Sequence, residues 1–226
     1  MAKSRYHHGD LRNGLLEAAA RLAEQGPEAV TVRACAKLVG VTPTAAYRHF
    51  AGHDELLLAV KDRAMEALGE AMSALVEKLR PQEDPLRAGL ARLAALGRGY
   101  VDFAVAQPGL FRTAFACAGE LPDAEWPDDP GGPCGMLAAA IDDLVTVGYI
   151  APASRPMAEF AMWAAVHGLG TLFTEGPLAG LPAAQREPIV DRTLAAAGLG
   201  LGDGPRADEV RDAGLIGSSC LGRPEG

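Results

Sequence analysis

Apolar residues recur along most of this chain at the three- and four-residue spacing of an amphipathic helix, and clear strand-like alternation is missing. The pattern is rich in Ala and Leu. Aromatic residues make up only 5% of the chain, which disfavours an aromatic-rich β-sandwich. The sequence therefore predicts an all-α protein of about nine helices.

Helix-breaking residues divide this pattern into short helices, one long helix and a C-terminal group of helices. The last 29 residues hold eight Gly and two Pro, which indicates little order. The expected divisions are a flexible basic arm over 1–9, a three-helix domain over 10–52, a long connecting helix over 53–80, a helical bundle over 81–197 and a flexible tail over 198–226.

The second and third predicted helices are short, and only Gly40-Val41 separates them. That arrangement is typical of a helix-turn-helix, whose second helix enters the major groove of DNA. Thr31 and Thr42 stand at helix N-termini, where hydroxyl groups and backbone amides bind phosphate. Arg33, in the first turn of its helix, is able to contact guanine through two hydrogen bonds.

The formal net charge of −8 would by itself disfavour a nucleic-acid binder. The charges are unevenly placed, however: residues 1–63 hold nine Lys or Arg against seven Asp or Glu, and four of the five His. The other residues hold twelve basic and 22 acidic side chains. DNA binding by the N-terminal part would therefore depend on placed contacts, while the acidic remainder limits non-specific binding.

The run TVRACAKLVGVTPTAAYRHF over 31–50 resembles the TetR family of transcriptional regulators, and the resemblance continues over 54–60. It implies that Tyr47 contacts backbone phosphate, that Thr44 and Ala45 face base edges, and that His53 takes the place of a frequent Lys. The DNA-binding residues that we predict are Thr31, Arg33, Thr42, Pro43, Thr44, Ala45, Tyr47, His49 and His53.

Several of these residues also have a purely structural interpretation. Tyr47 could fill a small three-helix core, and Arg33 could be a solvated surface charge. His49 and His53 have the spacing of a metal-binding pair, but Ala51-Gly52 interrupts the helix and no third ligand is obvious, so we expect no metal. The basic arm is either a disordered tail or a contact to an adjacent groove.

The remainder of the chain resembles, more weakly, the WHG type of TetR-family C-terminal domain, at 99–104, at 108–112 and at the motif WAAVHG over 163–168. The resemblance implies a helical domain that binds a ligand and dimerises. The candidate pocket residues are Met65, Tyr100, Phe103, Phe111, Phe115, Trp163 and His167. For any one of them plain core is the favoured interpretation, because large apolar residues at helical spacing are usually core. A pocket of this composition would favour a small apolar or aromatic compound.

Small and apolar residues on the last two predicted helices favour a dimer, because small side chains allow two backbones to approach closely. The candidate interface residues are Ala161, Ala165, Gly168, Leu172, Ile189, Val190 and Leu194. A dimer with one recognition helix in each copy predicts a near-palindromic double-stranded operator.

Other classes of protein find little support in the sequence. It has no GxSxG, HExxH or P-loop motif, so an enzyme is the least favoured interpretation, and we expect no cofactor. Four scattered Cys without a CxxC indicate reduced thiols. We expect no signal peptide, no membrane segment and a cytoplasmic location. The predicted function is a homodimeric repressor that a ligand releases from DNA; an activator or a ligand-independent regulator is the alternative.

Overall fold

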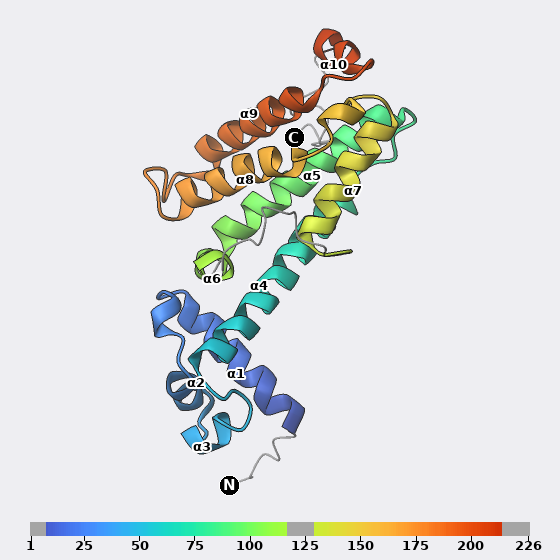
Figure 1. The fold of residues 1–226 in the computed structure, drawn as a ribbon. Coiled ribbons are helices and arrows are strands. Elements are labelled where there is room, and N and C mark those ends of the chain that lie inside the picture. The colour runs from blue at the N-terminus through green and yellow to red at the C-terminus, as the bar shows by residue number, and fades with distance from the viewer. Residues whose placement is uncertain (1–7, 117–128, 214–226) are drawn as a thin grey trace. The chain divides into compact units, whose positions relative to one another are not determined.

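The computed structural model describes residues 8–116 and 129–213, and every regular element within them is a helix (Figure 1). This confirms the predicted all-α class. The α-helices are α1 (His8–Ala23), α2 (Val32–Val39), α3 (Pro43–Ala46), α4 (His53–Val76), α5 (Pro85–Ala106), α6 (Pro108–Ala116), α7 (Pro133–Thr146), α8 (Ala158–Thr174), α9 (Ala183–Leu201) and α10 (Ala207–Ala213). Two short 3₁₀ helices are η1 (Pro27–Ala29) and η3 (Pro152–Ser154).

Contacts between residues divide the chain into two compact units. Unit 1 comprises Met1–Glu66 and Gln107–Leu121, and unit 2 comprises Ala67–Ala106 and Pro122–Gly226. Helix α4 contributes to both units, and α6 belongs to unit 1 although α5 and α7 belong to unit 2. Each unit is described here by itself.

Local capping interactions set the bounds of the short helices in unit 1. The Thr31 hydroxyl accepts a hydrogen bond from the Ala34 amide at 3.1 Å, and the Thr42 hydroxyl accepts one from the Ala45 amide at 3.2 Å. Gly40 ends α2 in the left-handed conformation, with φ of 76°, which glycine adopts at little cost. These caps stand where the sequence predicted them.

The third helix is short and ends at Ala46, because several of the following amides bond in tighter turns. The His49 amide, for example, donates to the Ala46 carbonyl at 2.9 Å. Ala46 and Phe50 are nonetheless buried, at 0% and 1% exposure, so this segment still packs its apolar side inward.

Helix α6 is fixed to the end of α1 inside unit 1. A Cβ at Gly109 would lie 2.6 Å from the carbonyl carbon of Ala23, so the two backbones are in direct contact. The Arg112 guanidinium donates to the Glu24 carbonyl at 3.0 Å, which satisfies an acceptor at the C-terminal end of α1. No local signal in the sequence links these positions, because more than 80 residues separate them.

Unit 2 is built around α5, which packs against α7, α8 and α9 and also contacts α4. At Gly99 a Cβ would lie 2.7 Å from the Met72 Cα, so glycine allows α5 to approach the backbone of α4. Most residues of α5 are buried, among them Leu86, Leu90, Leu93, Leu96, Tyr100 and Phe103.

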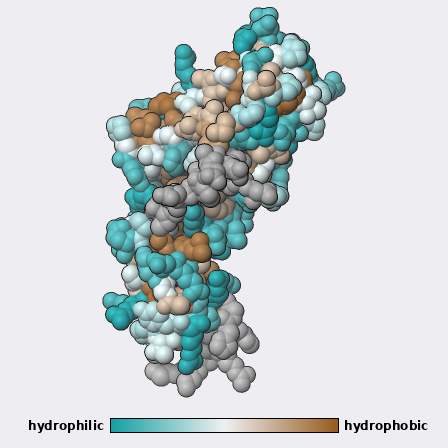
Figure 2. Space-filling view, viewed as in Figure 1, coloured by the Kyte–Doolittle hydropathy of each residue, from teal (hydrophilic) through white to brown (hydrophobic). Residues whose placement is uncertain are grey.

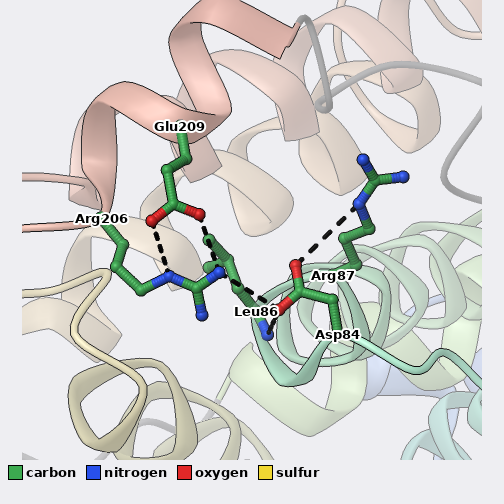
Figure 3. A network of polar contacts seen from close by, with 5 residues as sticks. All are labelled: Asp84, Leu86, Arg87, Arg206 and Glu209. Atoms are coloured by element: carbon green, nitrogen blue, oxygen red, sulfur yellow. Dashed lines mark hydrogen bonds and ion pairs between the residues drawn. The ribbon is translucent and has the colours of Figure 1, made fainter.

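The segment after residue 197 is more ordered than its glycine content predicted. Helix α9 continues to Leu201, and α10 follows over 207–213. Arg206 donates to Glu209 at 2.7 Å and to Asp84, before α5, at 3.2 Å, as Figure 3 shows. The Tyr149 hydroxyl also donates to the Gly198 carbonyl at 2.9 Å. These long-range contacts fix residues 198–213; the rest of the predicted tail, 214–226, lies outside the described residues.

The surface of the described residues is mixed in character, and Figure 2 shows hydrophilic and hydrophobic residues interspersed on one face. The exposed large apolar side chains are Leu38, Tyr47, Leu58, Met157, Leu172 and Leu199. Within the described ranges, no helix combines the length and the apolar character needed to cross a membrane.

Candidate nucleic-acid interface and body cluster

The predicted DNA-reading residues lie mainly on the solvent side of the helix-turn-helix in unit 1. Ala46 and Phe50 face the core, whereas Tyr47 is 42% exposed. The Tyr47 ring is therefore not a buried core aromatic, and it is accessible for contact. Exposed with it are Thr31, Arg33, Thr42, Pro43, Thr44 and His53, while Ala45 and His49 are half-buried.

The hydroxyl groups of the two capping threonines, Thr31 and Thr42, accept one hydrogen bond within the protein and still carry a hydrogen that they are able to donate. Each hydroxyl oxygen accepts a hydrogen bond from a backbone amide of its own helix. A hydroxyl group also carries one hydrogen of its own, which it is able to donate to a phosphate oxygen. Thr31 and Thr42 are thus arranged both to start α2 and α3 and to offer a donor to solvent.

His53 makes a contact that the sequence did not reveal. Its Nδ1 atom lies 2.8 Å from the Val30 carbonyl oxygen, 23 positions earlier in the chain. Close by, the Glu55 carboxylate accepts a hydrogen bond from the Ala51 amide at 2.6 Å, which caps the start of α4. The start of α4 is therefore held beside the residue that precedes Thr31, the N-cap of α2.

Cys35, under the exposed face of α2, is fully buried, and burial raises the pKa of its thiol to about 11. It is neutral near pH 7 and packs as an apolar residue. Cys35 is a free thiol. Cys117 and Cys220 lie outside the described residues.

The predicted pocket residues are divided between the two units. Met65, Phe111 and Phe115 belong to unit 1, where the Phe111 and Phe115 rings meet edge to face at 5.3 Å between centroids. Tyr100, Phe103, Trp163 and His167 belong to unit 2.

In unit 2, three of these side chains form a hydrogen-bonded cluster, which we call the body cluster: Tyr100 from α5, and Trp163 and His167 from α8. The Trp163 indole donates to the Tyr100 oxygen at 3.2 Å, and that oxygen lies 2.9 Å from the His167 Nδ1. Burial raises the pKa of Tyr100 and lowers that of His167, so both are neutral near pH 7. Neutral forms of both side chains are able to share this hydrogen bond.

Ion pairs join α5 to α9, and no motif in the sequence indicated them. Arg98 bonds Glu187 at 2.6 Å and also bonds Asp191, one turn further along α9. The Arg98 side chain is only 11% exposed. A bidentate guanidinium between two carboxylates on one helix face fixes the orientation of α9 on α5.

The predicted dimer residues differ in their accessibility. Ala161, Gly168 and Leu172 are exposed on α8, whereas Val190 and Leu194 on α9 are buried inside unit 2, at 1% and 6% exposure. A Cβ at Gly97 of α5 would lie 2.6 Å from Leu194, which shows how closely that side chain packs. Val190 and Leu194 therefore belong to the core of the chain itself and not to its exposed face, contrary to the prediction; Ala165 and Ile189 are half-buried.

No group of three His, Cys, Asp or Glu side chains suited to a metal ion occurs in the part of the chain that the structure describes.

Two family models match the chain. The model described as "Bacterial regulatory proteins, tetR family" matches residues 15–60, and the model "Tetracyclin repressor-like, C-terminal domain" matches residues 93–197. The first covers the helix-turn-helix. The second begins within α5 and ends within α9.

Individual proteins are also similar to this chain. Over 114 residues the chain is 32% identical to the nucleoid occlusion factor SlmA of Marinomonas sp. (strain MWYL1). This match covers 49% of this chain and 54%, about half, of that relative. A solved structure of a protein of unknown function from Rhodococcus sp. RHA1 is 26% identical, with a TM-score of 0.67 over 89% of this chain and 100% of that one. The minocycline complex of TetR-Q116A from Acinetobacter baumannii AYE shares the fold at 18% identity, with a TM-score of 0.55 over 86% and 95% of the two chains.

Proposed function

The chain belongs to the TetR family of DNA-binding transcriptional regulators, and we propose that it acts as a homodimeric repressor that a small-molecule ligand releases from its operator. The observation that carries DNA recognition is the helix-turn-helix of unit 1. Its second helix and the turns that follow it bury Ala46 and Phe50 and leave Tyr47 exposed beside two threonine-capped helix starts.

Recognition would combine several kinds of contact. In this proposal Arg33, Thr44 and Ala45 meet base edges, while Thr31, Thr42 and Tyr47 contact the DNA backbone. Pro43 presets the first turn of α3. One short recognition helix reads few base pairs, so two copies on a near-palindromic site supply the remaining specificity.

Release by a ligand would act through unit 2. The body cluster offers polar groups among apolar and aromatic neighbours, including Phe160, whose ring lies 6.5 Å from that of Trp163. A pocket of this composition would suit a small apolar or aromatic compound with a hydrogen-bonding group. A ligand lowers operator affinity if it binds more tightly to a dimer whose recognition helices are wrongly spaced for the operator. The size of this effect is limited by the difference between the ligand's affinities for the two forms of the dimer.

Selection of DNA fragments by the purified protein tests this function. We expect enrichment of a near-palindromic sequence, and its position near particular genes would indicate what the protein regulates. Tyr47→Ala should weaken binding of the selected site about tenfold or more while the dimer persists. Leu58→Ala, an exposed residue on α4 in the same unit, is the matched control. Wild-type binding without any sequence preference would contradict the proposal.

Release is tested with a panel of small aromatic and aliphatic compounds, measured as loss of operator binding. Repression itself requires a reporter gene placed behind the selected operator. Lower reporter expression with the protein, restored by an active compound, supports the proposal, whereas higher expression with the protein would make it an activator.

A further inference from the structure

We propose that Arg98 of α5 is a positioning residue for the homodimer: it holds the start of α9 in the orientation in which the exposed face of that helix meets a second copy. The inference rests on the proposed homodimer and deepens it, because it assigns control of dimerisation to a largely buried residue that need not touch the partner.

Arg98 bonds two successive turns of α9, and we call Arg98, Glu187 and Asp191 the Arg98 clamp. The Arg98 Nη1 atom lies 2.6 Å from a Glu187 carboxylate oxygen, and the Nη2 atom bonds Asp191. All three side chains are largely covered from water. Hydrogen bonds between charged groups are strong, and the planar guanidinium fixes their direction as well as their length.

The two carboxylates of the Arg98 clamp stand on either side of an interruption in α9. Pro188 lies inside this helix, between Glu187 and Asp191 in the sequence. Proline has no amide hydrogen, so the helical bond from residue 188 to the carbonyl of Ala184 is missing. A helix interrupted near its start depends on other elements to keep its first turns in line. Arg98 supplies such a contact on both sides of the proline.

Apolar packing holds the later turns of α9 more firmly than its start. Val190 and Leu194 are buried, and a Cβ at Gly97 of α5 would lie 2.6 Å from a Leu194 methyl carbon. Among residues 183–189, all of which the structure describes, none is buried. Apolar burial is therefore concentrated beyond Pro188, and the bond from Arg98 to Glu187 acts on the turns before it.

The side of α9 that faces away from the Arg98 clamp is exposed along most of its length. The exposed residues recur at a spacing of three or four and form one stripe: Gln185, Pro188, Arg192, Ala196 and Leu199. A rotation or displacement of the start of α9 would move this stripe relative to the exposed residues of α8. Because interfaces require close shape complementarity, a surface ordered in advance binds more tightly than one that must first be ordered.

The charges around Arg98 determine which variant is informative. Removal of Arg98 alone leaves Glu187 and Asp191 without their shared cation. The charges of Arg98, Glu187 and Arg186 also act on Asp102, one turn further along α5. A largely buried carboxylate without its partner destabilises a protein whatever the role of that partner. Replacing a whole buried ion-pair group by neutral side chains of similar volume is, in contrast, often tolerated.

The test therefore neutralises the whole Arg98 clamp in a triple variant, Arg98→Met with Glu187→Gln and Asp191→Asn. Sedimentation velocity over a dilution series gives the dimer dissociation constant. We expect it to rise about tenfold or more over wild type. The matched control is Arg92→Met with Asp143→Asn, which removes an ion pair of 2.6 Å between α5 and α7 and should leave the dimer unchanged.

Two further readouts separate positioning from a purely structural role. In hydrogen exchange, amides of residues 183–191 should exchange faster in the triple variant, while those in the middle of α5 keep their wild-type protection. Arg98→Lys retains the charge but lacks the planar group that bonds both turns, so its dimer should also be weaker than wild type. A role limited to balancing charge would leave the dimer of this variant intact.

Three outcomes would overturn this inference in distinguishable ways. A triple variant that dimerises as tightly as wild type would remove the role of the Arg98 clamp and leave the proposed homodimer intact. Loss of protection throughout α5 together with the dimer would make Arg98 a purely structural residue. A wild-type protein that is monomeric at every concentration would overturn the proposed homodimer and this inference together.

Discussion

The hydroxyl group of Tyr100 lies 2.9 Å from Nδ1 of His167, and it joins α5 to α8 at a point where both side chains are largely covered. The same oxygen accepts a hydrogen bond from the Trp163 indole. One phenol therefore bonds two partners on α8, one turn apart.

Replacing Tyr100 with Phe should destabilise unit 2. The substitution preserves the ring but removes two hydrogen bonds in a covered site, and the expected loss is about 1–3 kcal/mol in the free energy of unfolding. Urea titration followed by circular dichroism measures it. Unchanged stability would mean that the cluster contributes little to the fold and would strengthen its assignment to ligand binding.

The stability of the protein should fall in mildly acidic solution because of His167. Burial lowers the pKa of this imidazole in the folded protein, whereas an unfolded chain has the ordinary value of about 6.5. As the pH falls below that value, the unfolded state takes up the proton first, so the stability present above it is lost progressively toward the lower folded-state pKa. Melting temperatures between about pH 7 and 5 should decline less for His167→Asn, because asparagine does not titrate. Parallel curves would contradict the assignment.

Adding one methyl group at Gly109 should destabilise unit 1. A Cβ there meets the backbone of Ala23 at 2.6 Å, and a backbone cannot move aside as a flexible side chain does. We expect Gly109→Ala to cost about 1–3 kcal/mol. Gly14→Ala is the matched control, because its Cβ would meet only a Val39 methyl at 3.7 Å, and alanine favours a helix over glycine by about 1 kcal/mol. Similar unfolding curves for the two variants would show that α6 is not held as described.

The sequence predicted those features of unit 1 that depend on neighbours in the chain. The caps at Thr31 and Thr42 and the left-handed Gly40 each follow from residues within one helical turn. The bond from His53 to Val30 joins elements 23 residues apart, so no local pattern contains it. The sequence showed that His53 takes the place of a frequent Lys, but not the contact that positions its ring.

Tertiary contacts also explain the differences in unit 2. Glycine-rich composition after residue 197 indicates backbone freedom, but Arg206 and its bonds to Asp84 and Glu209 lie too far apart in sequence to be foreseen together. Helical periodicity placed Val190 and Leu194 on an apolar stripe. It does not distinguish a stripe that packs on α5 of the same chain from one that faces a second copy.

Gly168, on the exposed face of α8, allows a direct test of the proposed dimer interface. A Cβ at this position would have no atom within 4 Å in the single chain, so a longer side chain fits the isolated subunit. Gly168→Gln also raises helix propensity by roughly 0.5–1 kcal/mol, so the subunit should stay folded. At a close-packed interface the same side chain would clash. We expect sedimentation to show dissociation to monomers, and operator affinity to fall with it because one recognition helix reads only half of the site. Ala139→Gln, at an exposed small residue of α7, is the control and should remain dimeric. If Gly168→Gln forms dimers as tightly as wild type, the two copies meet through another surface.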